Sequence, residues 1–470
     1  MLSCDIVIRG GLVVNADGAS VQDVAIRGEK VAQVGGRMSG AREIQADGML
    51  VLPGGVDVHV HLSPARAAAA ESLHHWVDDF FSGSQAAIAG GITTFGNMTF
   101  QWAGESLHEA LERDLVQASK QSAVDFILHP VLTDPRPSVL NEIPDLAKKG
   151  FKSIKVFLSN PSFDAAIADF IKAIRLAGRH DVLVMMHCED QAILRAVADQ
   201  LEERGMNDVR RWADSRPDYA EEIAVRRAAA ICRATSASVY VVHVSSAAAL
   251  SACAAAKLNG LPFHVEARPM YLHLTRAELD SPDGGKYIGA PPLRELTDVS
   301  ALWEGLVDGT VDTWATDHAP WSLEAKLESG LNLQSARQGV ADLETSLPLL
   351  FTAGVTTGRI SMTRFVELVS TAPAKLFGLW PKKGVIAPGS DADIVLWDPD
   401  RKYTVDGSSM YSRAGYSVYD GREVTGSPTM TISRGTVVME SGRVSALPGR
   451  GVWLPVAHRP SPSATMVQDA

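Results

Sequence analysis

The sequence contains little cysteine and no long apolar run. Its 470 residues include four cysteines, none of them in the Cys-x-x-Cys spacing that is typical of zinc knuckles and redox sites. Four thiols are too few for a disulfide scaffold and fit a reducing cytosol, so we expect a cytoplasmic protein. No stretch approaches the roughly 18 apolar residues of a membrane span. The N-terminus, MLSCDIVIRGG, also lacks the basic and then apolar order of a signal peptide.

The chain has no surplus of positive charge either. Lysine and arginine total 44 against 55 aspartates and glutamates, which gives a net charge of −11. An acidic protein is a poor candidate for non-specific binding to nucleic acid or to an anionic membrane, so we expect neither as a partner. Hydrophobic residues at 46% and charged residues at 21% are typical of a soluble globular protein and exclude a disordered chain.

The two ends of the chain have a similar pattern of apolar residues and glycines. The first 50 residues are short alternating runs broken by glycine, a pattern typical of antiparallel strands with tight turns, and the same pattern returns after residue 376. We therefore predict one β-sandwich domain built from residues 1–52 and 376–446. Residues 447–470 are rich in proline, serine and glycine, which predicts an extended C-terminal tail that packs on a neighbouring subunit or is disordered.

The middle of the chain, residues 53–375, alternates short β-branched or apolar runs with helical stretches. Helical spacing or alanine-rich composition marks 105–121, 163–178, 218–236 and 246–257. An alternation of eight strands with helices predicts an α/β fold, a (β/α)8 or TIM barrel. The eight runs are GVDVHVHL, GITTFGNM, VDFILHPVL, FKSIKVFL, DVLVMMHC, SVYVVHVS, LPFHVEARP and TVDTWATD.

Five of these eight strands end in a candidate metal ligand. Residues two apart on a strand share a face, so both histidines of His-x-His on the first strand point into the barrel. Active sites of such barrels lie at the C-terminal ends of the strands, and imidazole with carboxylate suits zinc and similar divalent ions. A lone His-x-His is weak evidence, but this convergence predicts a metal site. The candidates are His59 and His61 on the first strand, Lys155 on the fourth, His187 on the fifth, His243 on the sixth and Asp317 on the eighth.

Lys155 and Asp317 each admit two interpretations. A lysine in an apolar strand can be snorkelling or ion-paired, or it can have a lowered pKa and a neutral amine that reacts with carbon dioxide to give a carbamate. Beside two cations the carbamate is favoured, because an ammonium group would repel them. A strand-end aspartate commonly caps a turn, but a position opposite His59 and His61 favours a ligand that also handles protons. Asp57 shares their face and is expected to orient the site.

The motifs GGVDVHVHL, FKSIKVFL, MMHCED, VVHVSSAAAL, GAPPLRE and ATDHAP resemble, in this order, those of the amidohydrolase superfamily. The most similar branch is the cyclic amidases, which comprises hydantoinase/dihydropyrimidinase, allantoinase and dihydroorotase. The resemblance covers nearly the whole chain. It implies a hydrolase that opens a cyclic amide or imide at a C–N bond by means of a hydroxide held between two divalent metal ions.

The resemblance also implies roles for the candidate ligands. His59, His61 and Asp317 would hold the first metal, His187 and His243 the second, and carboxylated Lys155 would bridge them. Asp317 would pass a proton from the hydroxide to the leaving nitrogen. Zinc is expected, although manganese or cobalt suits the same ligands. Dimeric and tetrameric relatives imply a homodimer or a homotetramer.

At four substrate-binding positions the sequence departs from the family patterns. Asn160 stands where hydantoinases have an oxyanion-binding tyrosine, and Ala290 stands where they have a serine before Pro-Pro-Leu-Arg. Ser63 and Trp321 replace an arginine and a histidine of dihydroorotases. We expect all four residues to contact the substrate.

The nearby aromatic residues indicate which ring is taken. Phe100, Trp102 and Trp321 near strand ends indicate an apolar pocket for a ring without an obligatory carboxylate, such as a hydantoin or a dihydropyrimidine. Allantoin or dihydroorotate hydrolysis remains an alternative. A non-catalytic scaffold related to dihydropyrimidinase is disfavoured, because such proteins lose metal ligands and all six positions are filled here.

Overall fold

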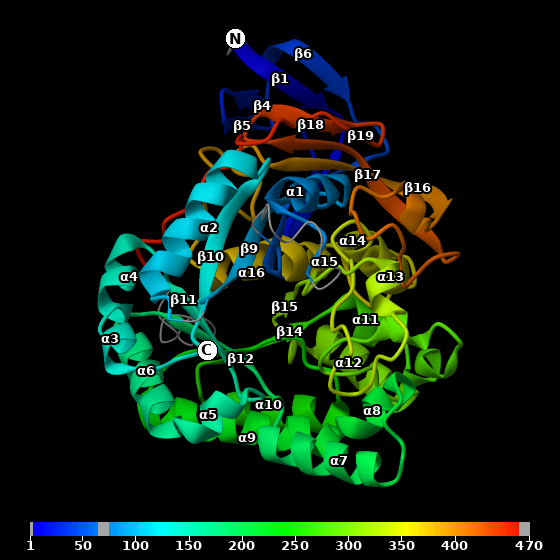
Figure 1. Ribbon diagram of the computed structural model, residues 1–470. Coiled ribbons are helices and arrows are strands. Elements are labelled where there is room, and N and C mark those ends of the chain that lie inside the picture. The colour runs from blue at the N-terminus through cyan, green and yellow to red at the C-terminus, as the bar shows by residue number, and fades with distance from the viewer. Residues whose placement is uncertain (1–2, 64–74, 103, 460–470) are drawn as a thin grey trace.

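The computed structural model describes residues 3–63, 75–102 and 104–459. Within these residues, eight parallel strands form one sheet in which each strand pairs with the next along the chain. Helices surround this sheet, and strands from both chain ends form separate layers beside it (Figure 1). The barrel strands are β8 (Gly55–Val60), β9 (Ile92–Phe100), β10 (Asp125–Val131), β11 (Ser153–Phe157), β12 (Leu183–His187), β13 (Val239–Val241), β14 (Phe263–Ala267) and β15 (Thr313–Trp314).

The barrel closes where β15 meets β8, close to the histidines of the first strand. Val60 forms a parallel bridge with His318, and the backbone N–H of His61 donates to the carbonyl of His318 at 2.7 Å. Slightly lower, the buried carboxylate of Asp57 accepts from the backbone N–H of Thr316 at 3.2 Å. These contacts join the first strand to the last, so residues that are far apart in sequence meet at one rim.

Helices cover the outside of the barrel. Several begin at a side-chain cap, as in α2, where Ser106 and Glu109 form a reciprocal capping box. The predicted helix at 163–178 is divided at Ala166, because Pro161 starts a separate short helix before it. The α-helices are α1 (Phe80–Ala89), α2 (Leu107–Gln121), α3 (Pro137–Leu140), α4 (Ile143–Lys149), α5 (Pro161–Ala165), α6 (Ile167–Arg179), α7 (Gln191–Glu203), α8 (Trp212–Ser215), α9 (Asp218–Thr235), α10 (Ala247–Leu258), α11 (Pro269–His273), α12 (Leu296–Asp308), α13 (Leu323–Lys326), α14 (Ser346–Leu350), α15 (Met362–Val366) and α16 (Ala372–Leu376).

Short helices of other types fill several connections. The 3₁₀ turns are η1 (Val209–Arg211), η2 (Arg276–Asp280), η3 (Gly284–Tyr287) and η6 (Gly407–Ser409), and the π-helical turns are η4 (Phe351–Val355) and η5 (Glu367–Thr371). Among the described helices, none has both the length and the hydropathy that crossing a bilayer requires.

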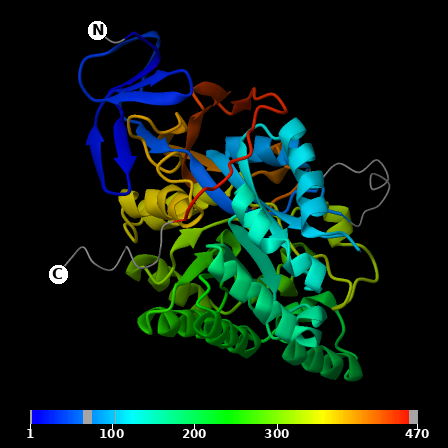
Figure 2. The same ribbon diagram turned by 90° about the vertical axis from the view of Figure 1, so that its left-hand side faces the viewer.

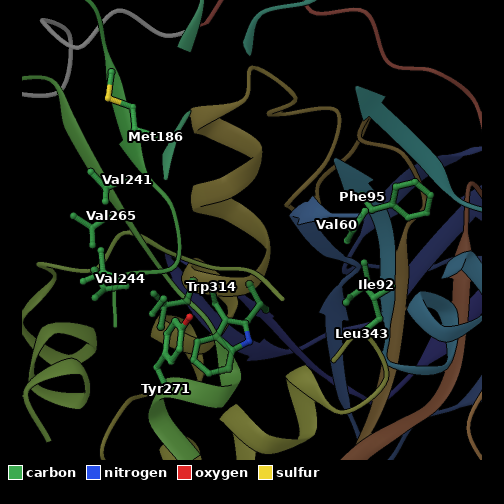
Figure 3. Packing of buried hydrophobic residues seen from close by; sticks show 14 of the residues in the cluster. Val60, Ile92, Phe95, Met186, Val241, Val244, Val265, Tyr271, Trp314 and Leu343 are labelled. Carbon is green, nitrogen blue, oxygen red and sulfur yellow. The ribbon is translucent and has the colours of Figure 1, made fainter. Parts of the chain in front are cut away.

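Alternation along each strand separates two apolar cores. Val184 and Met186 of β12 point outward into the core that the helices cover, together with Trp314 and Tyr271 (Figure 3). Leu183 and Met185 belong instead to the core inside the barrel. His187 follows Met185 by two residues and therefore points inward as well. The same period of two that builds the cores thus places a polar side chain at the top of the barrel.

Two sheets lie beside the barrel, at the end of the molecule opposite α7 and α9 (Figures 1 and 2). One contains β5 (Lys30–Val34), β4 (Val24–Arg27), β1 (Ser3–Arg9) and β6 (Ser39–Gln45). The other, in spatial order, contains β19 (Arg443–Val444), β18 (Thr436–Glu440), β17 (Glu423–Ser433), β16 (Ile394–Thr404), β7 (Leu50–Pro53), β2 (Leu12–Asn15) and β3 (Gly18–Val21). Because β7 pairs with β16, the prediction that both chain ends build this β layer is confirmed.

The predicted tail packs on the barrel of its own chain over residues 447–459. Trp453 stacks on Phe151 with ring centroids 4.8 Å apart, and the N–H of Leu454 donates to the carbonyl of Phe126 at 2.9 Å. Leu454 and Val456 join the core inside the barrel and close its floor. These apolar side chains anchor the described part of the predicted tail on the barrel of its own chain. Residues 460–470 lie outside the described part of the chain.

Candidate metal centre

All six predicted ligands line one cavity of about 510 Å³ at the C-terminal ends of the barrel strands. Lys155 and His59 are fully buried, and the other four side chains are nearly so. They come from five strands: His59, Lys155 and His187 lie within β8, β11 and β12, whereas His61, His243 and Asp317 stand one to three residues beyond the ends of β8, β13 and β15. The other residues that line the cavity are Trp76, Phe100, Thr133, Phe157, Ser159, Asn160, Pro161, Ala290, Ala319, Gln338 and Gly339.

His59, His61 and Asp317 form the first ligand group. Asp317 Oδ1 lies 2.8 Å from His61 Nε2 and 3.1 Å from His59 Nε2. One ligand atom from each residue falls within 4.8 Å of the other two. Two imidazole nitrogens and a carboxylate oxygen that converge in this way fit a divalent ion.

His187 and His243 form the second group. His187 Nδ1 lies 3.0 Å from His243 Nε2, while the other ring nitrogen of His187 lies 2.7 Å from Glu189 Oε2. The carboxylate of Glu189 is held in turn by Arg216, whose Nε lies 2.9 Å from Oε1. Because Glu189 fixes one nitrogen of the ring, the other is presented to the cavity as a ligand.

Lys155 lies between the two groups without a hydrogen-bond partner. Its side chain is completely buried, and its Nζ contacts no acceptor among the described residues. Burial lowers the pKa of Lys155 to about 8, against the opposing effect of Asp317 and Glu266. A buried amine that is partly neutral near physiological pH has the chemistry needed to take up carbon dioxide.

Asp317 and the histidines have the protonation states that metal binding requires. Burial alone would raise the pKa of Asp317, but the Arg268 guanidinium and the two adjacent imidazoles hold it well below its usual range. Burial lowers the pKa of His61 to about 4 and that of His59 well below its usual value. At neutral pH the carboxylate is ionised and the imidazoles are neutral, and these are the forms that bind metal.

Two of the candidate ligands have strained backbones. His243 has φ 42° and Asp317 has φ 50°, in the left-handed region that favours glycine. Such a conformation costs on the order of 1–3 kcal/mol per residue and persists where the surrounding structure fixes it. Here the two residues stand two and three residues beyond the short strands β13 and β15, and both line the cavity.

Three supporting side chains were missed at the level of sequence. Glu266 Oε1 lies 2.9 Å from His59 Nδ1 and accepts from the backbone N–H of His243 at 2.8 Å. Glu189 and Arg268 support His187 and Asp317, respectively. One signal in the sequence is that Glu189 and Glu266 are acidic residues at strand ends. The spacing of two residues from His187 to Glu189 could have indicated that pair, whereas Glu266 meets His59 through strand packing that the sequence does not state.

The predicted substrate-binding residues divide into two pairs. Asn160 and Ala290 line the cavity. Asn160 Oδ1 accepts from the backbone N–H of Ser162 at 3.0 Å and caps α5, so its acceptor oxygen is engaged. Ser63 and Trp321 are not among the described lining residues. Trp321 instead donates from Nε1 to the carbonyl of Gln338, which does line the cavity, at 2.8 Å.

An aromatic wall faces the ligand groups. Phe100 lies 5.7 Å from Trp76 and 6.0 Å from Phe157 between ring centroids, and Trp76 lies 4.9 Å from the ring of His61. Trp102, which was expected near the pocket, packs under Arg113 instead, 4.1 Å from the guanidinium carbon to the ring centroid. No arginine is among the described residues that line the cavity, and Lys155 is the lysine that does.

Known proteins resemble the chain over almost its full length. A model of the amidohydrolase family matches residues 50–438. A D-hydantoinase from Rhizobium radiobacter is 36% identical over 453 residues, covering 95% of this chain and 98% of the relative. A solved D-hydantoinase structure has a TM-score of 0.91 at 34% identity, covering 96% of this chain and 99% of its own. The crystal structure of dihydropyrimidinase from Brevibacillus agri has a TM-score of 0.90 at 32% identity, covering 97% and 99%. The chain therefore belongs to the amidohydrolase family.

Proposed function

We propose that the protein hydrolyses a C–N bond of a cyclic amide or imide, such as a hydantoin or a dihydropyrimidine, in a metal-dependent ring opening. The observation that carries this proposal is the cavity in which six ligand-type side chains from five strands converge around an unpartnered lysine. The names of its relatives, D-hydantoinase and dihydropyrimidinase, support the same reaction. A scaffold protein would have no need to retain buried, strained and unpaired ligands.

Two divalent ions fit the side chains present. His59, His61 and Asp317 would hold one ion, and His187 with His243 the other. Lys155, as a carbamate, would supply the anionic bridge, which its lack of a hydrogen-bond acceptor among the described residues supports. Nitrogen and oxygen ligands of this kind favour zinc. When bound, two such ions would lower the pKa of a water molecule and polarise the substrate carbonyl.

Asp317 is assigned the proton transfer. Its Oδ2 is engaged by Arg268, and its Oδ1 faces the imidazoles of the cavity. Its ionised carboxylate can accept the proton that the attacking water loses and then deliver it to the ring nitrogen as the C–N bond breaks. One proton of the water is thus moved to the leaving ring nitrogen, and the other stays on the new carboxyl group, which ionises at neutral pH and releases it to solvent.

Asn160 is assigned to the developing negative charge on the carbonyl oxygen. Because its Oδ1 is engaged in capping α5, its NH₂ group is left as the donor at the cavity wall. Preorganised donors of this kind are worth about 10²–10³ in turnover where they contact an oxyanion. Ala290 would contribute its backbone, since its side chain has no polar atom.

The lining of the cavity favours an uncharged ring. Recognition of a substrate carboxylate typically uses arginine, and none lies among the described lining residues. The aromatic wall of Trp76, Phe100 and Phe157 suits an apolar ring substituent. Hydantoins and dihydropyrimidines are therefore preferred over dihydroorotate, and allantoin is the second candidate because it also lacks a carboxylate.

A substrate panel on zinc-reconstituted protein tests the proposal. Ring opening would be compared for hydantoin, 5-phenylhydantoin, dihydrouracil, allantoin, dihydroorotate and succinimide. We expect the hydantoins and dihydrouracil to have the highest kcat/KM. A clear preference for dihydroorotate, or an absence of turnover on every ring, would contradict the assignment.

Three further statements remain predictions. Zinc as the resident metal follows from ligand type. A homodimer or homotetramer follows from the resemblance stated above. A cytoplasmic location follows from cysteine usage.

A further inference from the structure

Lys326 is a second buried lysine close to the cavity. It is the last residue of α13, and it is 1% exposed. Its Nζ donates to the backbone carbonyls of Ile288 at 2.7 Å, Arg337 at 2.7 Å and Gly339 at 2.9 Å. Among the described residues, no carboxylate forms an ion pair with it. The three acceptors therefore match the three N–H bonds of one ammonium group.

The three carbonyls belong to two backbone strips that border the cavity, residues 288–290 and 337–339. Ala290 of the first strip lines the cavity, as do Gln338 and Gly339 of the second. The strips also touch directly, since the N–H of Gly339 donates to the carbonyl of Ile288 at 3.0 Å. Lys326 thus binds both strips from behind the wall that they form.

Two tryptophans complete this arrangement. Trp212 Nε1 donates to the carbonyl of Gly289 at 2.7 Å, and Trp321 Nε1 donates to the carbonyl of Gln338 at 2.8 Å. Together with Lys326, these donors engage consecutive carbonyls along both strips. The indoles hold one carbonyl each, whereas Lys326 joins one strip to the other, so the spacing between the strips depends on Lys326.

This wall can meet a polar ligand mainly through its backbone. Ala290, Ala319 and Gly339 have no polar side-chain atoms, so only their backbone and the side chain of Gln338 can offer polar groups. The N–H and the carbonyl of Gly339 are already bonded to Ile288 and Lys326, and the N–H of Ala319 donates to Val340, so the backbone of Ala290 is the part of this wall that meets a ring. A cyclic amide or imide has a planar edge of alternating N–H and C=O groups, which the backbone of Ala290 and the side chain of Gln338 can match when the two strips are held at a fixed spacing. The histidines and Asp317 line the same cavity.

We propose that Lys326 is a positioning residue for substrate: it sets the spacing of the strips 288–290 and 337–339 and thereby orients the amide edge of the ring. This inference rests on the proposed function, because it needs a ring with such an edge. Lys326 touches neither substrate nor metal ligand, and it acts through the backbone that it holds. Burying an uncompensated cation is costly, and the three carbonyls offset that cost.

The test compares Lys326→Met with Lys326→Gln and wild type, all loaded with zinc. Methionine keeps the volume and removes every donor, so we expect KM for hydantoin to rise at least about tenfold with kcat changed less than about threefold. Lys326→Gln keeps two N–H donors and should give an intermediate KM. Amide hydrogen exchange should become faster across both strips in Lys326→Met while zinc content stays unchanged.

Lys383→Met is the control for a merely structural effect, since it also removes a buried lysine but at a distance from the cavity. It should leave KM unchanged, and because its lower stability speeds exchange throughout the chain, exchange in the two strips should not rise more than exchange elsewhere. An unchanged KM in Lys326→Met, or a lower kcat at constant KM, would overturn the proposal, as would unchanged exchange. If Lys326→Met fails to fold, the same readouts on Lys326→Gln decide. If wild type opens no ring, the proposed function fails, while the exchange data still report on the role of Lys326 in spacing the strips.

Discussion

The mouth of the barrel and its junction with the β layers each bury a lysine, and the two lysines have opposite surroundings. At the junction, Lys383 Nζ lies 2.6 Å from Asp125, 2.9 Å from Asp391 and 2.6 Å from Asp393. At the mouth, Lys155 Nζ has no hydrogen-bond acceptor among the described residues and lies 4.9 Å from the ring centroid of Phe157. The charge of Lys383 is balanced by three carboxylates of its own chain. Lys155 has no such group, so we expect it to bind a group that the chain does not supply.

The two regions look alike when only acidic and imidazole groups are considered. Asp125, Asp391 and Asp393 converge closely enough to hold a metal ion, as His59, His61 and Asp317 do. At the junction, however, the Lys383 ammonium already occupies the centre of the three carboxylates. Convergence of ligand atoms is therefore a weak signal by itself. Two further features distinguish the candidate metal centre from the junction: the buried Lys155 without a hydrogen-bond acceptor, and the left-handed backbones of His243 and Asp317.

The largest effect is expected at Lys155. Replacing it with alanine removes the proposed bridge, so kcat/KM for hydantoin should fall at least about a thousandfold, with loss of bound metal. Partial rescue by acetate or propionate would support a carboxylate at this position. Steady-state kinetics and elemental analysis on the same preparation provide the measurement. An alanine variant with full metal and full rate would remove the distinction between the two lysines.

Asp317 is expected to show the next largest effect. Asp317→Asn keeps an oxygen ligand but cannot accept a proton, so kcat should fall about 10²–10⁴-fold while metal remains bound. The matched control is Asp391→Asn, which changes the same group at the junction and should leave kcat per folded molecule unchanged. Wild-type turnover in Asp317→Asn would rule out its role in proton transfer.

Substituting the two lysines with methionine should change stability in opposite directions. Burial alone would lower the pKa of Lys383, but the three carboxylates hold it above its usual range, so its charge stabilises the fold at every pH below 10.5. Lys383→Met leaves three buried carboxylates without their cation and should lower the free energy of unfolding by about 3–5 kcal/mol. Urea unfolding at pH 7 measures this, and an unchanged midpoint would contradict it.

Lys155→Met should raise the stability of the metal-free protein. The pKa of Lys155 is about 8 in the fold and 10.5 as a free side chain, so the unfolded chain holds the proton more tightly. The buried charge therefore costs about 3 kcal/mol below pH 8, and this cost disappears as pH rises toward 10.5. Urea unfolding of metal-free wild type and Lys155→Met measures this. The variant should have the higher free energy of unfolding at pH 7, and the difference should be smaller at pH 10. A loss of stability at pH 7 would show that Lys155 has an unrecognised partner.

Much of the site could be predicted from the sequence because its ligands stand on strands. The period of two places His59 and His61 on one face, and barrel topology then brings Lys155, His187, His243 and Asp317 to the same rim. The β layers followed from the similar texture of the two chain ends. Helix ends were less predictable, as the division at Ala166 shows, because a proline cap redirected the chain there.

The features of the site and the fold that the sequence did not predict depend on contacts between segments far apart in the chain. Glu266 meets His59, and Arg268 meets Asp317, across strands whose packing the sequence does not state. The left-handed backbone of His243 and Asp317 could not be predicted either, because neither residue type favours it as glycine does. The anchoring of 447–459 was missed because three apolar side chains outweigh a composition that is typical of a tail.

The most direct test of the account is to measure metal content and ring opening together during chelation and zinc add-back. Elemental analysis would follow divalent ions per chain while hydantoin hydrolysis is recorded on the same samples. The account predicts that the rate falls in step with metal loss and returns as about two ions per chain rebind. A rate that persists once the divalent ions are gone would contradict it.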